Sequence, residues 1–231
     1  MIAGLQKMTL LDFPGRVACT VFLQGCNYRC PFCHNSELLS RQTEPMMDTE
    51  AFLSFLKNRK GLLDGVCVSG GEPTLEPELE DLLRAIKALG YAVKLDTNGS
   101  RPEVLKQLVQ SGLVDFVAMD VKNSPARYAE TVGLGKADLS AVEESLRFLL
   151  SGAVDYELRT TVVSPLHSAA DIDEMGAWVA SFGIPGKWFL QAFTDRDTVV
   201  FSGLSAPTEE ELFQYKEHLS QYARQAAVRG A

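Results

Sequence analysis

Short apolar runs alternate with amphipathic stretches along most of this chain, and that alternation limits the choice of fold more than any other feature. The runs are rich in β-branched and aromatic residues, which is typical of strands. The stretches between them repeat apolar residues three and four positions apart, which is typical of helices. The predicted strands are residues 17–23, 65–68, 91–95, 116–119, 156–163 and 188–193, and the predicted helices are residues 49–58, 78–89, 102–110, 139–150, 170–181 and 208–227.

Such an alternation predicts an α/β fold with parallel strands. Eight strand–helix steps would close a standard barrel, so six steps predict a partial, open (β/α)6 barrel. The 231 residues contain no internal repeat, low-complexity tract or long linker. The expected organisation is therefore a single domain, residues 1–231, with a turn-rich lead-in at 1–16, the barrel at 17–195 and a C-terminal helix at 208–227.

Composition and charge narrow the functional classes. The net charge of −8 disfavours binding to nucleic acid, because the phosphate backbone attracts basic proteins. No apolar run approaches the roughly 18 residues of a membrane span, and the first four residues do not begin like a signal peptide. The odd number of cysteines, five, agrees with a reducing compartment, so we expect the cytoplasm and no membrane partner.

Three of the five cysteines lie within eight residues, directly after the first predicted strand. Cys26, Cys30 and Cys33 have the spacing C-x3-C-x2-C. Thiolates are the usual ligands of iron–sulfur clusters. Three of them would leave one iron of a four-iron cluster without a protein ligand, and that iron could bind another molecule.

A zinc site, a disulfide framework and a set of core cysteines each fit this stretch less well. A structural zinc site takes four ligands, and His34 could be the fourth, but it is adjacent to Cys33 and neighbouring side chains rarely chelate one ion tetrahedrally. A disulfide framework is not needed by a chain of this size and ordinary composition. Buried core cysteines fit least, because Asn27, Arg29 and Asn35 give the stretch the polarity of a loop.

The remaining cysteines and histidines have simpler expectations. Cys19 and Cys67 lie within predicted strands, and free cysteine is among the most buried residue types, so both are predicted to be core residues. His167 follows a Ser-Pro turn and His218 lies on the last predicted helix, so both are expected to be solvated. His34 is a candidate site residue because it lies beside the cysteines.

Polar residues also follow the next three predicted strands. The carboxyl ends of parallel strands are where α/β proteins place their chemistry, so these residues are candidates for one polar site. They are Gly70, Gly71 and Glu72 after the second strand, Asp96 and Thr97 after the third, and Asp120 and Lys122 after the fourth. Paired glycines let a ligand approach the backbone closely, although a plain tight turn would also account for them. Arg159, within the fifth strand, would be costly to bury unpaired, so we expect it to point into the same cavity.

The cysteine stretch, with the aromatic Phe32 before its last cysteine, resembles the cluster loop of radical S-adenosylmethionine (SAM) enzymes. The resemblance implies a [4Fe–4S] cluster on Cys26, Cys30 and Cys33, with SAM bound through its amino and carboxylate groups to the open iron. Gly-Gly-Glu-Pro at 70–73 resembles the element with which these enzymes hold the amino group of SAM.

The later strand ends resemble those of glycyl-radical-enzyme activases. In that family the positions matching Asp96, Thr97 and Asp120 line the SAM site and can hold a monovalent cation. The position matching Lys122 pairs with the SAM carboxylate. The expected fold is then the open barrel of the radical SAM type.

Two further stretches bear on the kind of activase. Residues 4–15, Gly-Leu-Gln-Lys-Met-Thr-Leu-Leu-Asp-Phe-Pro-Gly, resemble the start of the activating proteins of anaerobic ribonucleoside-triphosphate reductase. Pyruvate formate-lyase activases usually have Asp-Gly-Pro-Gly there, and a histidine near the end of the sixth strand, where this chain has Gln-Ala-Phe-Thr at 191–194. A second cysteine cluster, as some activases have, is not expected.

The resemblance implies an oxidoreductase that cleaves SAM reductively and uses the 5′-deoxyadenosyl radical to abstract hydrogen from a glycine of a partner enzyme. The electron would come from a flavodoxin or a ferredoxin-type donor. Three alternatives stay open: an activase of pyruvate formate-lyase or another glycyl radical enzyme, a radical SAM enzyme acting on a small molecule, and an iron–sulfur electron carrier. An electron carrier would need neither Gly-Gly-Glu-Pro nor the strand-end carboxylates.

Overall fold

The computed structural model of the chain describes residues 2–40 and 44–229. Its strands are β1 (Ile2–Thr9), β2 (Ala18–Leu23), β3 (Gly65–Gly70), β4 (Ala92–Thr97), β5 (Phe116–Asp120), β6 (Asp155–Val162), β7 (Lys187–Ala192) and β8 (Gln225–Arg229). Its helices are α1 (Thr49–Lys57), α2 (Leu79–Ala88), α3 (Pro102–Gln110), α4 (Tyr128–Thr131), α5 (Leu139–Leu150), α6 (Ala169–Ala180) and α7 (Glu209–Leu219), with short 3-10 helices η1 (Ser36–Leu38) and η2 (Pro73–Leu75).

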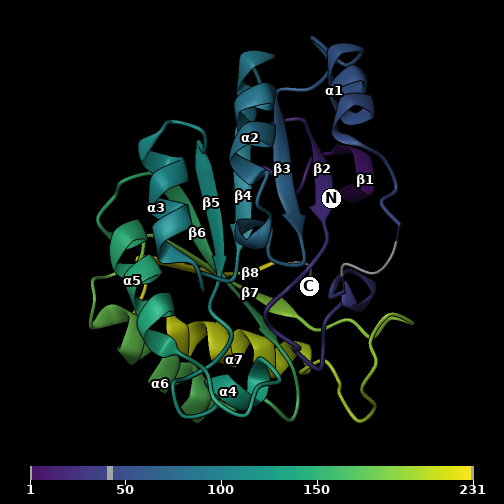
Figure 1. The fold of residues 1–231 in the computed structure, drawn as a ribbon. Helices are drawn as coiled ribbons and strands as arrows, with labels where there is room; N and C mark the ends of the chain where they lie inside the picture. Colours follow the sequence, from purple (N-terminus) through teal and green to yellow (C-terminus); the bar gives the residue numbers. More distant parts are fainter. Residues whose placement is uncertain (1, 41–43, 230–231) are drawn as a thin grey trace. The chain divides into compact units, whose positions relative to one another are not determined.

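The sheet is open and mostly parallel, with the strand order β1-β2-β3-β4-β5-β6-β7-β8 (Figure 1). The prediction of an open α/β fold with parallel strands is confirmed, and β2 to β7 correspond to the six predicted strands. The chain forms two compact units. The first comprises residues 2–27, 37–40, 44–97 and 103–118, and the second comprises residues 28–36, 98–102 and 119–229.

In the first unit, the register of the parallel strands aligns the segments that carry the candidate residues. β2 pairs with β3 from Ala18↔Gly65 to Leu23↔Gly70, and β3 pairs with β4 in parallel. The cysteine stretch and the glycine pair therefore begin at neighbouring strand ends. α2 packs against β4 and buries Leu79, Leu82, Leu83 and Ile86, and α1 lies beside α2 (Figure 1).

In the second unit, β6, β7 and β8 are parallel, with Leu158 paired to Trp188 and Trp188 to Ala226. α6 and α7 pack against each other, and α7 also contacts β7 and β8. The predicted start of the last helix is confirmed, because Thr208 and Glu211 form a reciprocal capping box there.

Two strand assignments differ from the sequence prediction. The lead-in contains β1, which pairs antiparallel with β2 from Ile2↔Leu23 to Thr9↔Ala18. The prediction of a helix at 208–227 was wrong beyond Leu219, since the chain turns there and forms β8. Arg229 at the end of β8 donates two hydrogen bonds of 2.8 Å to the buried carboxylate of Glu157, so a contact distant in sequence favours the strand.

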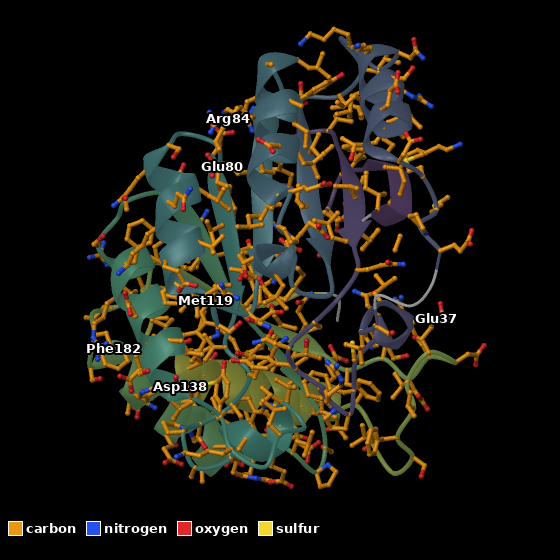
Figure 2. All side chains as sticks on the ribbon, in the orientation of Figure 1. Glu37, Glu80, Arg84, Met119, Asp138 and Phe182 are labelled. Atoms are coloured by element: carbon orange, nitrogen blue, oxygen red, sulfur yellow. The ribbon has the colours of Figure 1, made fainter. Side chains whose placement is uncertain are left out.

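The outward faces of the helices carry ordinary surface pairs. On α2, Glu80 and Arg84 are one helical turn apart and form an ion pair (Figure 2). Within the described residues, no helix is both long and apolar enough to cross a membrane.

Candidate functional site

The glycine pair after β3 lies directly against the start of the cysteine stretch. A Cβ added to Gly71 would lie 2.2 Å from the carbonyl oxygen of Gly25, and one added to Gly70 would lie 2.3 Å from that of Leu23. The amide of Gly71 donates to the Leu23 carbonyl at 2.9 Å, and the amide of Glu72 donates to the Gly25 carbonyl at 2.8 Å. Only glycine allows this approach of two backbones, so the pair is more than a tight turn.

Glu72 is buried, with 1% of its surface exposed, and its carboxylate is held from three directions. Its Oε1 accepts hydrogen bonds from the Thr74 amide at 3.1 Å, the Thr74 hydroxyl at 2.5 Å and the Thr97 hydroxyl at 2.8 Å. Thr97 ends β4, so the candidates after β3 and after β4 form one hydrogen-bonded set.

Asp96, beside Thr97, is held within the same unit. Its Oδ2 accepts a hydrogen bond of 3.0 Å from the hydroxyl of Ser69, and its Oδ1 forms an ion pair with Lys94. Sequence reasoning missed Lys94. The available signal was a charged residue two positions before Asp96 in an otherwise apolar strand, since residues two apart share a face of a sheet.

In the second unit, the candidates after β5 form an ion network with β6. Lys122 Nζ lies 2.8 Å from Asp120 Oδ2, and Arg159 Nε lies 3.1 Å from Asp120 Oδ1. The side chains of Lys122 and Arg159 are 16% exposed and that of Asp120 is 30% exposed, so the network is reachable from solvent. Two cationic side chains therefore flank the Asp120 carboxylate, and ammonium and guanidinium groups are donors that bind carboxylates.

His167 supports this network, and the prediction that it is solvated was wrong, because it is 4% exposed. Its Nδ1 lies 3.1 Å from the Val163 amide and so accepts, which leaves Nε2 to donate to the Lys122 carbonyl at 2.8 Å. Burial lowers the pKa of His167, so the ring stays neutral at pH 7. The contact with Lys122 is 45 residues away in sequence, so the local sequence does not reveal it.

Main-chain hydrogen bonds hold both the first and the second part of the cysteine stretch, residues 25–35. At its start, the Gly25 carbonyl accepts from the amide of Glu72, as described above. In its second part, the Arg29 amide donates to the Val132 carbonyl at 2.8 Å, and the Cys33 amide donates to the Cys30 carbonyl at 3.1 Å. Phe32 is buried in an apolar cluster with Val163, Leu166 and Phe193, against which Cys30 also packs.

The three cysteines are half-buried. Among the described residues, no three His, Cys, Asp or Glu side chains are grouped about the position of a single metal ion.

His34 contacts the segment after β7. Its Nε2 lies 2.7 Å from the Thr194 carbonyl, and its ring stacks on Phe193 at 5.7 Å between centroids. Burial is the main cause that lowers the pKa of His34. The ring therefore links the cysteine stretch to β7 through the described contacts.

The prediction for the two strand cysteines is confirmed. Cys19 and Cys67 are both 0% exposed. Burial raises the pKa of Cys19 to about 12, which disfavours its thiolate and hence metal binding.

Known proteins are similar to this chain over most of its length. A family model for the radical SAM superfamily matches residues 20–179. A protein of Methanocaldococcus jannaschii assigned as a glycyl-radical enzyme activating enzyme is 30% identical over 99% of this chain and 95% of its own length. The pyruvate formate-lyase-activating enzyme of Clostridium pasteurianum is 34% identical, but over 53% of this chain and 52% of its own length.

Solved structures share the fold. SuiB of Streptococcus suis matches with a TM-score of 0.69 at 14% identity, over 92% of this chain and 49% of its own. A domain of the pyruvate-formate lyase-activating enzyme from Bacteroides vulgatus matches with a TM-score of 0.58 at 21% identity, over 72% of this chain and 99% of its own. The chain therefore belongs to the radical SAM superfamily and, within it, to the family of glycyl-radical enzyme activating enzymes.

It is an enzyme of a superfamily that works with a [4Fe–4S] cluster and SAM. The residues present fit that pair of cofactors. Three half-buried cysteines are the expected donors for a cluster with one open iron. In the first unit, the backbone at Gly70 and Gly71 carries no side chain and can be approached closely by a ligand. In the second unit, Lys122 and Arg159 are cationic groups of the kind that bind a carboxylate.

Proposed function

We propose that the chain generates a glycyl radical on an anaerobic ribonucleoside-triphosphate reductase. Cys26, Cys30 and Cys33 hold the [4Fe–4S] cluster in this proposal. The proposed SAM ligands are Gly70, Gly71, Glu72, Asp96 and Thr97 of the first unit and Asp120, Lys122 and Arg159 of the second unit.

The observation that carries the choice of partner is the sequence at 4–15, which is typical of activating proteins for this reductase. It is supported by Gln-Ala-Phe-Thr at 191–194, where formate-lyase activases usually have a histidine. The full-length similarity to a glycyl-radical enzyme activating enzyme also supports it, since the formate-lyase relative covers about half of the chain.

When bound, the cluster and SAM supply a 5′-deoxyadenosyl radical by reductive cleavage of SAM. The chain's own residues bind and orient the reactants. Glu72 is held by Thr74 and Thr97 in one orientation, ready to accept from the amino group of SAM. Lys122 and Arg159 offer positive charge to its carboxylate.

The proposed electron donor is a flavodoxin or a ferredoxin-type protein, because reductive cleavage of SAM needs a one-electron donor.

A monovalent cation is proposed at Asp96, Thr97 and Asp120. Comparing SAM affinity in potassium, sodium and tetramethylammonium salts tests the cation, because the bulky organic cation cannot replace it.

Replacing Lys122 by alanine is expected to weaken SAM binding by at least ~tenfold while the cluster still assembles. Truncating one member of a buried charge pair costs on the order of 2–5 kcal/mol, and about 1.4 kcal/mol corresponds to a factor of ten in Kd. Isothermal titration of SAM into the anaerobically reconstituted protein measures the change. Lys216→Ala is the matched control, because Lys216 is also paired with a carboxylate and lies on α7, away from the proposed ligands in sequence. An unchanged Kd in Lys122→Ala would remove Lys122 from the site.

Electron paramagnetic resonance tests the function itself. The reduced protein, SAM and the reductase from the same organism should give a glycyl radical doublet on the reductase, with 5′-deoxyadenosine formed in step. A reductase whose radical glycine is replaced by alanine should give no doublet. A doublet on pyruvate formate-lyase but not on the reductase would change the partner. 5′-Deoxyadenosine without a protein radical on either enzyme would favour a small-molecule substrate, and no 5′-deoxyadenosine at all would favour an electron carrier.

A further inference from the structure

A fully buried lysine lies within the first unit. Lys94 is in the middle of β4, directly opposite Cys67 of β3, and 1% of its surface is exposed. Its neighbours in the strand, Val93 and Leu95, are 0% exposed. A buried ammonium group is costly unless it is paired, so its partners are informative.

The ammonium group of Lys94 contacts the side chains of Asp96 and Cys67. Nζ forms an ion pair with Asp96 Oδ1 and lies 3.8 Å from the sulfur of Cys67. The second carboxylate oxygen of Asp96 accepts from Ser69 at 3.0 Å. Each oxygen of Asp96 thus has a donor from the sheet itself, and the carboxylate is held in one orientation at the end of β4.

Stability alone does not account for this pair. A buried ion pair is often no more stabilising than apolar side chains of similar volume, and the surrounding strand is apolar. What the pair does provide is a carboxylate that is held in one orientation while 14% of its side chain is exposed. That carboxylate precedes Thr97, whose hydroxyl binds Glu72.

We propose that Lys94 is a positioning residue for SAM binding: its ammonium group fixes the orientation of the Asp96 carboxylate, and Asp96 contacts SAM. This inference rests on the proposed function, in which Asp96 is a SAM ligand. Lys94 itself does not contact SAM and acts through Asp96.

Three variants test the inference: Lys94→Met, Asp96→Asn and the double variant. Lys94→Met keeps the length of the side chain and removes its charge. We expect it to raise the Kd for SAM at least ~tenfold with unchanged iron content. We expect Asp96→Asn to raise the Kd similarly, and the double variant to bind SAM no more weakly than Asp96→Asn alone, because the two residues act as one unit.

A control separates positioning from general loss of stability. Glu157→Gln disrupts the other buried ion pair described above, that with Arg229, and none of the proposed ligands is changed. It is expected to lower the melting temperature without changing the Kd for SAM. If Lys94→Met fails to fold, Lys94→Gln, which removes the same charge with a shorter polar side chain, takes its place and must show the weakened SAM binding.

Each outcome has one meaning. Wild-type affinity in Lys94→Met, wild-type affinity in Asp96→Asn, or additive losses in the double variant would overturn the positioning role. A wild-type protein that assembles no cluster or binds no SAM would instead overturn the proposed function, before any variant is compared.

Discussion

Replacing Cys30 by alanine is expected to abolish cluster assembly and, with it, the cleavage of SAM. A site with three thiolates and one open iron has no spare ligand, and Cys30 packs against the apolar residues around Phe32. Iron and sulfide analysis of anaerobically purified protein, together with the rate of 5′-deoxyadenosine formation under reducing conditions, measures the loss.

The matched control for this variant is Cys19→Ala. Cys19 is a free thiol of the same chain but lies fully buried in β2, so its removal should lower stability slightly and leave iron content and SAM cleavage unchanged. Full iron content in Cys30→Ala would show that Cys30 is not a ligand. One zinc ion per wild-type chain would contradict the cluster as a whole.

Replacing Gly71 by alanine is expected to lower both the stability of the protein and its affinity for SAM. The added Cβ would lie 2.2 Å from the carbonyl oxygen of Gly25. That oxygen belongs to the main chain and cannot rotate away as a side chain could, so one of the two segments must move. Gly71 does not adopt a left-handed conformation, so the effect comes from this contact and not from backbone strain. Overpacking of this kind costs about 1–3 kcal/mol, occasionally more.

Gly135→Ala is the control for that substitution, because nothing lies within 4 Å of an added Cβ there and its backbone is not left-handed. The melting temperature, the iron content and the affinity for SAM should all fall in Gly71→Ala and stay at wild-type values in Gly135→Ala. Equal behaviour of the two variants would mean that the glycine pair is an ordinary turn.

Local patterns were enough to predict the parts of the fold with strong periodicity. The apolar run at 17–23 and the helical spacing of Leu79, Leu82, Leu83 and Ile86 each reflect burial on one face, and the structure agrees with both. β8 was missed because Gln-Ala-Ala-Val-Arg favours a helix on its own and becomes a strand only by pairing with β7. β1 was missed for a related reason, since its central residues are exposed at the edge of the sheet.

The residues of the candidate site also differ in whether the local sequence reveals them. The cysteines, the glycine pair and the strand-end carboxylates stand out because their residue types are unusual where they occur. Lys94 and His167 do not, because their importance depends on partners distant in the chain: Nζ of Lys94 reaches the facing strand, and Nε2 of His167 reaches the Lys122 carbonyl. A polar group whose burial is decided by tertiary contacts cannot be recognised from its neighbours in sequence.

The main-chain hydrogen bonds between the segment at Gly25 and the end of β3 also affect how a metal centre assembles. The amides of Gly71 and Glu72 donate to Leu23 and Gly25, so the first residues of the cysteine stretch are ordered by the sheet and not by the metal. A metal centre that forms there has less chain entropy to overcome than one that must organise a free loop. Those two amides should accordingly exchange with deuterium as slowly as the interior of β3, both before and after iron is loaded.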